Sequence, residues 1–152
     1  MPCCYRIFPD QKLMCVKYTG ILTLREMLGL LDEVDADPEY DFDVNEFDDF
    51  TELQKIAMSP AEILKLVQLM IALYRRRDSD KLNAIIAPPW IVAKAISVFA
   101  RVAVEGGVKV KVVESFDEGF AFLSLPPSAA EEALAWFATA GDAAGTAAGG
   151  CG

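Results

Sequence analysis

The stretch that decides the fold is ADPEYDFDVNEFDDFTEL, residues 36–53. Its first half is dominated by acidic side chains, and its second half adds Phe47, Phe50 and Leu53 to further acids. An acidic, proline-containing segment followed by an apolar-rich run is typical of a solvated connection that leads into a strand. We therefore expect a strand over residues 44–50 with its acids on an exposed side.

The same stretch has a competing interpretation as a calcium loop. From Asp35 to Glu46, acids stand at positions 1, 3, 5, 7, 9 and 12 of the window, which are the ligand positions of an EF-hand. That loop requires glycine at position 6, where this chain has Tyr40. An EF-hand also needs a helix on each side, and a strand is expected after this loop. We therefore predict no metal site and keep calcium as the weaker alternative.

Upstream of this stretch, the sequence predicts a hairpin and a helix. Two short apolar runs, residues 4–8 and 13–18, flank the turn residues Pro9 and Asp10, which is typical of a β-hairpin. Thr23 and Glu26 then form a capping box that begins a helix ending near residue 37.

Downstream, helices and strands alternate to the end of the chain. Ser59, followed by proline and by Glu62, is the signature of a helix start, and that helix is expected to end near Arg77. The remaining predicted elements are a strand over 81–87, a helix from Trp90 to about Glu105, a strand over 108–113, a short helix over 115–123 and a last helix over 128–140.

This order predicts an α/β fold with a four- to five-stranded, mainly parallel sheet and an antiparallel N-terminal hairpin. Lys17, Asn83, Lys109 and Lys111 interrupt the predicted strands, although central strands covered on both faces are usually apolar throughout. We therefore expect helices mainly on one face. The other face would be open, partly covered by the C-terminal helix, or paired with another subunit.

The chain has 152 residues, a length that favours one domain. We predict a single domain over residues 1–140, in which 128–140 is an appended helix. Residues 141–152 are rich in glycine and alanine, and we expect this tail to be disordered.

The chain resembles the SpoIIAA-like family. The resemblance is carried by the hairpin, TGILT before the first helix, ADPEYDFDVNEFDDFTEL, SPAEI, NAIIAP and VKVVESFDEGFAFL. That family belongs with STAS-type domains and with lipid-binding relatives of similar fold. The resemblance covers about residues 4–125. It implies a βα superhelix with a sheet of four to five strands, in small cytosolic bacterial proteins of unknown biochemical role. The appended helix and the tail lie outside it.

Charge and hydropathy limit the partners and the location. The net charge is −9, which argues against nucleic acid and against tight binding to anionic lipid. No uncharged apolar run reaches the roughly 18 residues of a membrane span, so we expect no membrane insertion. The N-terminus lacks the pattern of a signal peptide, and we expect a cytoplasmic protein. The four cysteines are expected to be reduced, with Cys3 or Cys4 pairing with Cys15 as the alternative.

The chain contains no histidine, which removes the histidine-dependent triads and dyads and the usual histidine-containing zinc sites. Asp48 and Asp49 are predicted near the carboxyl end of the third strand, where open α/β sheets usually bind ligands. Adjacent strand residues point to opposite faces, so they are a poor acid–base pair. We therefore expect no catalytic activity and no cofactor, and keep a carboxylate-dependent hydrolase as the weakest alternative.

Two further residues are candidates for a ligand or partner site. Ser59 holds the place nearest to the phosphorylatable serine that the resemblance implies, but AMSPAE departs from the family's Asp-Ser-Ser-Gly type of loop. An ordinary N-cap is therefore the simpler interpretation of Ser59. Trp90 follows the fourth strand at the same edge, either as a ligand platform or as a packed residue at a helix start.

The helices after Ser59 and after Trp90 are apolar around more of their circumference than one sheet face needs. Neighbouring helices, a homodimer contact or an apolar ligand would each explain this. We therefore expect a non-catalytic binding or regulatory module that acts through a protein partner or self-association as a homodimer. The alternative is a carrier of a small apolar ligand such as a lipid.

Overall fold

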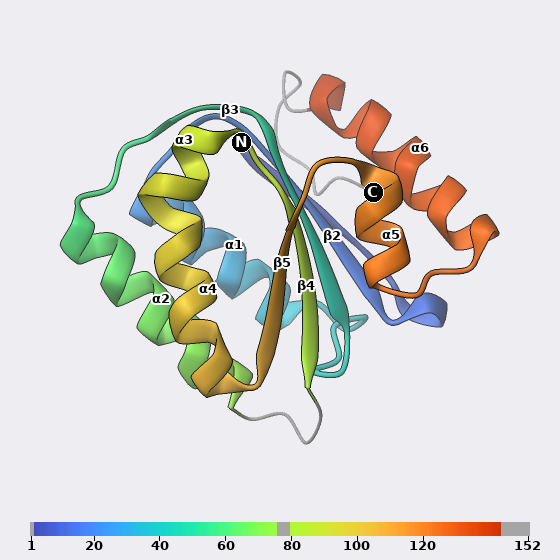
Figure 1. Ribbon diagram of the computed structural model, residues 1–152, viewed down its shortest axis with the longest axis horizontal. Helices are drawn as coiled ribbons and strands as arrows, with labels where there is room; N and C mark the ends of the chain where they lie inside the picture. The colour runs from blue at the N-terminus through green and yellow to red at the C-terminus, as the bar shows by residue number, and fades with distance from the viewer. Residues whose placement is uncertain (1, 76–79, 144–152) are drawn as a thin grey trace.

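The computed structural model describes residues 2–75 and 80–143, and a five-stranded sheet forms its centre (Figure 1). The sheet order is β1-β2-β3-β4-β5, with β1 antiparallel to β2 and every other pair parallel. The topology confirms the predicted α/β fold with an N-terminal hairpin. The strands are β1 (Cys3–Phe8), β2 (Leu13–Leu22), β3 (Asn45–Ile56), β4 (Lys81–Ile86) and β5 (Val108–Val113).

Three connections cover one face of the sheet, which we call the first face (Figure 1). Because successive parallel strands are neighbours, right-handed crossovers place all the connecting helices on one side. The elements on this face are α1 (Leu24–Ala36), α2 (Pro60–Tyr74), α3 (Pro89–Ile91) and α4 (Ser97–Ala103), with a π-helical turn over Val92–Ile96 joining the last two.

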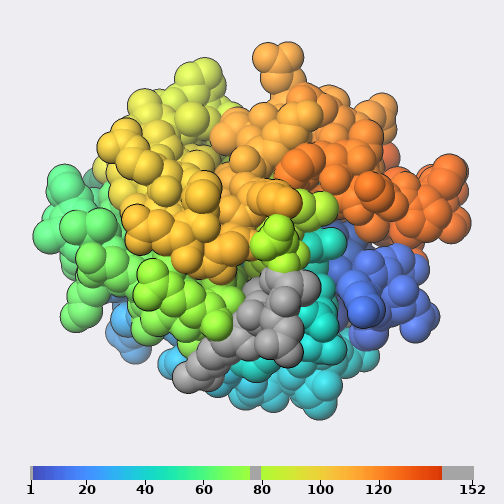
Figure 2. Space-filling view, turned by 60° about the horizontal axis from the view of Figure 1, so that its bottom comes forward, coloured from blue at the N-terminus to red at the C-terminus, as the bar shows by residue number. Residues whose placement is uncertain are grey.

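Helices α2 and α4 pack against each other, with the rings of Tyr74 and Phe99 6.5 Å apart between centroids. This contact accounts for part of the wide apolar arcs that both helices carry. In the space-filling view of Figure 2, α4 (yellow) lies beside α2 (green) on one side of the molecule, with the C-terminal helices (orange) on the other.

The second face is covered in part by α5 (Phe116–Phe122) and α6 (Pro127–Ala143), which is one of the three arrangements that the sequence left open. Its core is built around Phe47, whose ring centroid lies 5.5 Å from that of Phe116, 5.2 Å from Phe120 and 5.4 Å from Phe137. The C-terminal helix is therefore part of the hydrophobic core.

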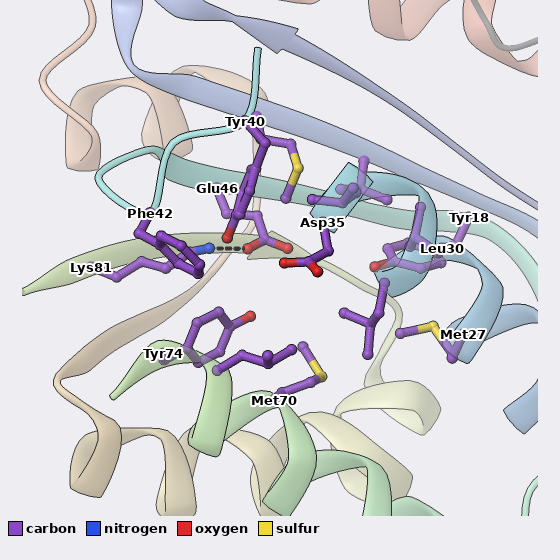
Figure 3. A pocket seen from close by; sticks show the side chains of 15 residues that line it. Tyr18, Met27, Leu30, Asp35, Tyr40, Phe42, Glu46, Met70, Tyr74 and Lys81 are labelled. Carbon is purple, nitrogen blue, oxygen red and sulfur yellow. Dashed lines mark ion pairs between the residues drawn. The ribbon is translucent and has the colours of Figure 1, made fainter. Parts of the chain in front are cut away.

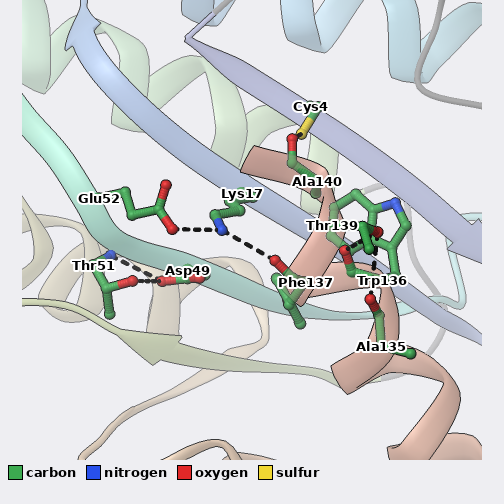
Figure 4. Close-up of polar contacts among 10 residues, drawn as sticks. All are labelled: Cys4, Lys17, Asp49, Thr51, Glu52, Ala135, Trp136, Phe137, Thr139 and Ala140. Atoms are coloured by element: carbon green, nitrogen blue, oxygen red, sulfur yellow. Dashed lines mark hydrogen bonds and ion pairs between the residues drawn. The ribbon is translucent and has the colours of Figure 1, made fainter. Parts of the chain in front are cut away.

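The interpretation of Lys17 and Asn83 as markers of an exposed face was wrong, because their exposed fractions are 5% and 0%. Lys17 is buried under α6, where its Nζ lies 2.7 Å from Glu52 Oε1 and donates to the Phe137 carbonyl at 3.0 Å (Figure 4). A lysine can be buried when such partners replace water. Lys109 and Lys111 on the edge strand β5 are exposed, as expected.

Several boundaries differ from the prediction. β3 continues to Ile56 rather than ending at residue 50, and α6 includes residues 141–143, which were expected in the disordered tail. Helix α2 ends at Tyr74, so Arg75 follows it; Arg76 and Arg77 lie outside the described residues. The rest of the predicted tail, with Cys151, also lies outside them.

No disulfide joins Cys3, Cys4 or Cys15. Over residues 2–75 and 80–143, none of the helices has the length and apolar character needed to cross a membrane.

Candidate ligand-binding site

A cavity of about 40 Å³ lies between α1, α2 and the first face of the sheet (Figure 3). Strands β2, β3 and β4 supply its floor, the two helices supply its walls, and the acidic connection 37–44 contributes Tyr40 and Phe42 to the lining. The lining is mostly apolar and aromatic, with three charged side chains. Its residues are Met14, Val16, Tyr18, Met27, Leu30, Leu31, Val34, Asp35, Tyr40, Phe42, Glu46, Met70, Leu73, Tyr74 and Lys81.

The alternation of β3 decides which of its acids face the cavity. Side chains along a strand point to opposite faces in turn. Glu46, Asp48 and Phe50 therefore lie on the first face, whereas Phe47 and Asp49 lie on the second. In the strand register, Glu46 stands beside Met14 of β2, which also lines the cavity. The strand thus places one carboxylate in the cavity floor.

Glu46 and Lys81 form a buried ion pair in that floor. Lys81 Nζ lies 2.5 Å from Glu46 Oε2, and both side chains are almost fully shielded from solvent. The Lys81 ammonium also lies 4.6 Å from the centroid of the Tyr74 ring, a cation–π geometry. Because desolvating two charges is expensive, each of them depends on the other to remain buried.

Asp48 and Tyr18 form a second polar contact close to this pair. Tyr18 Oη donates to Asp48 Oδ1 at 3.3 Å, and both groups are buried. Burial, followed by the negative charge of Glu46, raises the pKa of Asp48 well above its usual value. Burial and the charge of Asp48 likewise raise the pKa of Tyr18. The two carboxyl groups on this face thus differ, because Glu46 is ion-paired whereas burial disfavours the charged form of Asp48.

The structure corrects the predicted position of Asp48 and Asp49. They lie in the first half of β3, eight and seven residues before its end at Ile56, which is on the order of 25 Å along the strand. They are therefore not near the end of β3, although the strand register places them beside Ile85 and Ile86 at the carboxyl end of the shorter strand β4. Asp48 accepts a hydrogen bond from Tyr18, which lines the cavity, but is not itself among the lining residues.

Asp49 lies on the second face, so the predicted separation of the two aspartates is confirmed. Its Oδ1 accepts hydrogen bonds from the backbone N and the Oγ1 of Thr51, at 2.8 Å and 2.6 Å (Figure 4). These local bonds give Asp49 a structural role that requires no ligand.

Ser59 and Trp90 lie at the carboxyl edge, away from the cavity lining. Ser59 forms the predicted capping box: its Oγ accepts from the Glu62 backbone N at 3.3 Å, and Glu62 Oε2 accepts from the Ser59 backbone N at 2.7 Å. The hydrogen bonds from Ser59 lower the pKa of Glu62. Trp90 is 42% exposed at the start of α3. The structure does not bring these two residues together with Asp48 or Asp49 in one site.

Two acids of the connection between α1 and β3, Asp37 and Asp41, accept hydrogen bonds from the backbone. Asp37 Oδ1 accepts from the Glu39 backbone N at 2.9 Å, and Asp41 Oδ1 accepts from the Asp43 backbone N at 3.1 Å. These are the side-chain-to-backbone bonds that stabilise turns. In the part of the chain that the structure describes, no group of three or more His, Cys, Asp or Glu is placed to hold a metal ion.

The residues that form the cavity floor were not predicted from the sequence. The expectation that the acids of this strand lie on an exposed side was wrong, because Glu46, Asp48 and Asp49 are buried. Lys81 was expected only as the first residue of a strand. One signal was available: Glu46 and Lys81 each place a charge within one of two strands that were expected to be neighbours. Because buried charges occur in pairs, this pattern indicates an ion pair between the two strands. Tyr18, Tyr40 and Tyr74 carried no distinguishing pattern.

The chain was compared with known proteins. No family model and no curated protein sequence matches it. Its structure is similar to the crystal structure of an uncharacterized protein from the DUF3478 family with a SpoIIAA-like fold, from Shewanella loihica PV-4. The two share 22% sequence identity with a TM-score of 0.49, over 80% of this chain and 93% of that one. The fold named for that protein is the one that the sequence resemblance implied.

Proposed function

We propose that this chain is a non-catalytic binding module that takes a small ligand into the cavity between α1 and α2. The observation that supports this proposal is the buried Glu46–Lys81 ion pair in the floor of a mostly apolar cavity. A hydrophobic pair of similar volume would usually be at least as stable as a buried ion pair. Apolar pockets with a few convergent polar groups are the usual form of small-molecule sites.

A binding role is favoured over catalysis by the state of the candidate reactive groups. Burial raises the pKa of Cys3 to about 12 and that of Cys15 well above its usual value, so neither thiol is disposed to form a nucleophilic thiolate. Asp48 and Asp49 face opposite sides of the sheet. The chain has no histidine to act as an acid or base.

The size of the cavity bears on the lipid alternative. A volume of about 40 Å³ accommodates on the order of three water molecules. An acyl chain would need α1 and α2 to move apart, which the flexible side chains of Met14, Met27 and Met70 would ease. A small ligand, or one end of a longer ligand, is therefore the occupant that this geometry favours.

Self-association is the second candidate function. Leu64 and Leu69 on α2 are 45% and 42% exposed, and Val104 after α4 is 70% exposed, although α2 and α4 already pack together. Burying them against a second copy of the chain would remove apolar surface from water. Native mass spectrometry tests this: a dimer that Leu64→Glu converts to monomer would support it, and a monomer at every concentration would contradict it.

The cavity proposal is tested by filling the cavity. Met70 lines it and is half-buried, whereas its neighbour Leu69 is exposed and does not line it. We expect a screen of small organic fragments by backbone-amide NMR to yield ligands that bind the wild type and Leu69→Trp but not Met70→Trp. Fragments that bind Met70→Trp equally well, or a screen without a ligand for the wild type, would contradict the proposal.

The cytoplasm is the location we propose. Cytoplasmic thiols are kept reduced, and none of the three described cysteines is in a disulfide. Fractionation of the source cells with an antibody against the protein would check it.

A further inference from the structure

The cavity opens to solvent beside Asp35, where its lining is no longer buried. Asp35 on α1 is exposed, and Tyr40 and Phe42 are half-buried, whereas Glu46 and Lys81 in the floor are buried. In Figure 3 the Asp35 carboxylate points into the space that the Tyr74 hydroxyl faces from the opposite helix. A ligand that enters therefore meets a carboxylate at the mouth and an ammonium in the floor.

The electrostatic field at the mouth is negative. Glu46 compensates the charge of Lys81, while Asp35 is in none of the ion pairs found among the described residues. The adjacent chain reinforces this charge, because residues 32–52 include eleven acids and no lysine or arginine. A cleft lined by one sign of charge concentrates ligands of the opposite sign. The mouth therefore favours a cation.

Aromatic rings add to this preference. Tyr40, Phe42 and Tyr74 are the aromatic residues other than Tyr18 that line the cavity, and the Tyr74 ring already holds the Lys81 ammonium at 4.6 Å from its centroid. Faces of aromatic rings attract ammonium groups. The rings nearest the mouth, Tyr40 and Phe42, are placed to do the same for an ammonium beside Asp35.

The floor of the cavity favours a different chemical group of the ligand from the one favoured at the mouth. An ammonium has three N–H donors. Among the described residues, Lys81 Nζ has the Glu46 carboxylate and the Tyr74 ring as neighbours but no further hydrogen-bond partner. The end of a ligand that reaches the floor is therefore best matched by a hydrogen-bond acceptor such as a hydroxyl oxygen.

From these contacts we propose that the ligand is a small organic cation that carries a hydrogen-bond acceptor at its other end, such as a short amino alcohol. Its ammonium group lies between Asp35 and the rings of Tyr40 and Phe42, and its acceptor faces Lys81. A cavity that holds on the order of three water molecules suits a ligand of three or four non-hydrogen atoms. This inference rests on the proposed function, because it assigns a ligand class to the same cavity.

The test compares ligands of similar size that differ in charge or in the hydrogen-bond acceptor. Backbone-amide NMR titrations at pH 7 would use ethanolamine as the cation, 1,2-ethanediol as the neutral analogue, glycolate as the anion, and propylamine as a cation without the acceptor. We expect ethanolamine to bind most tightly and glycolate least. Asp35→Asn should weaken ethanolamine binding by about two- to fivefold, the range of an exposed charge pair, and leave the diol unchanged. Asp32→Asn, also exposed on α1 but outside the lining, is the matched control.

The outcomes separate this inference from the function on which it rests. If the diol or glycolate binds as tightly as ethanolamine, and Met70→Trp abolishes that binding, the cavity is a ligand site but the preference for a cation is wrong. An ethanolamine affinity that Asp35→Asn and Asp32→Asn reduce equally, or that propylamine matches, also overturns the assignment. If neither these probes nor any fragment binds the wild type, both the assignment and the proposed function fail.

Discussion

The ion pair of Glu46 and Lys81 makes two buried residues depend on each other. Glu46→Leu leaves the Lys81 ammonium without its counter-charge in a buried environment. Breaking a buried pair in this way typically costs about 3–5 kcal/mol, whereas replacing both partners with apolar residues is often neutral. We therefore expect Glu46→Leu and Lys81→Met each to lower the free energy of unfolding in urea strongly, and the double variant to lose less than either. A double variant that loses the sum of the two single effects would contradict a direct pair.

Asp48 predicts a pH dependence with a defined sign. Its pKa is raised in the folded state, so between the unfolded value near 3.9 and the raised folded value, the folded protein holds a proton that the unfolded chain releases. The free energy of unfolding therefore falls as the pH rises through this window. Asp48→Asn cannot titrate, and its stability relative to wild type should rise from pH 5 to pH 8, by up to about 1.4 kcal/mol per pH unit. Urea unfolding at the two pH values measures this, and a constant difference would contradict it.

Some features of individual residues could be predicted from the sequence and others could not. Strand alternation was enough to place Asp48 and Asp49 on opposite faces. The partners of Glu46 and Lys17 were not predictable, because they come from Lys81 and from the backbone of α6, both distant in sequence. Pairings of this kind depend on the register of neighbouring strands and on helix docking.

The starts of α1, α2 and α5 were predicted correctly because their signals are local. Thr23 and Ser59 both form the capping boxes that their sequences indicate, and Ser115 caps α5. The length of β3 was underestimated because its extension past Phe50 exposes mostly polar side chains. This extension pairs with residues 19–22 of β2 on one side only, because it lies beyond the end of β4.

Two substitutions of Ser59 test whether capping the helix is the only role of this side chain. Ser59→Ala removes the side-chain acceptor for the Glu62 backbone N and should lower the free energy of unfolding by about 1 kcal/mol. Ser59→Asp keeps an acceptor at the N-cap and should remain close to wild type. Thermal unfolding of the wild type and the two variants measures these differences in stability. If aspartate destabilises the protein as much as alanine, Ser59 has a role besides capping.

Gly119 tests how closely α5 approaches the sheet. A Cβ at Gly119 would overlap the ring of Phe47, whereas a Cβ at Gly29 in α1 meets nothing within 4 Å. Gly119→Ala should therefore destabilise the protein by about 1–3 kcal/mol through overpacking. Gly29→Ala should stabilise it by up to about 1 kcal/mol, because alanine favours helix more than glycine does. Similar effects of both substitutions on the urea midpoint would show that α5 packs less closely than described.

For the molecule as a whole, the two faces of the sheet have different roles. The second face is covered in part by a core of phenylalanines under α5 and α6, and the buried Lys17 there is matched by Glu52 and by a helix carbonyl. The first face contains the cavity, the Glu46–Lys81 pair and the acidic mouth. The sequence predicted the topology that separates these faces, because strands and helices alternate. It could not decide whether α6 covers the second face, since that depends on apolar side chains brought together only in the folded chain.

The five methionines allow the central claim, that the cavity on the first face binds a small ligand, to be tested in one measurement. Met14, Met27 and Met70 line the cavity, whereas Met58 is buried outside the lining. Protein labelled with ¹³C at the methionine methyl groups would be titrated with ethanolamine and, separately, with 1,2-ethanediol. We predict saturable shifts of the Met14, Met27 and Met70 signals with a stationary Met58 signal. Binding that leaves those three signals in place, or that moves Met58 equally, would contradict the claim.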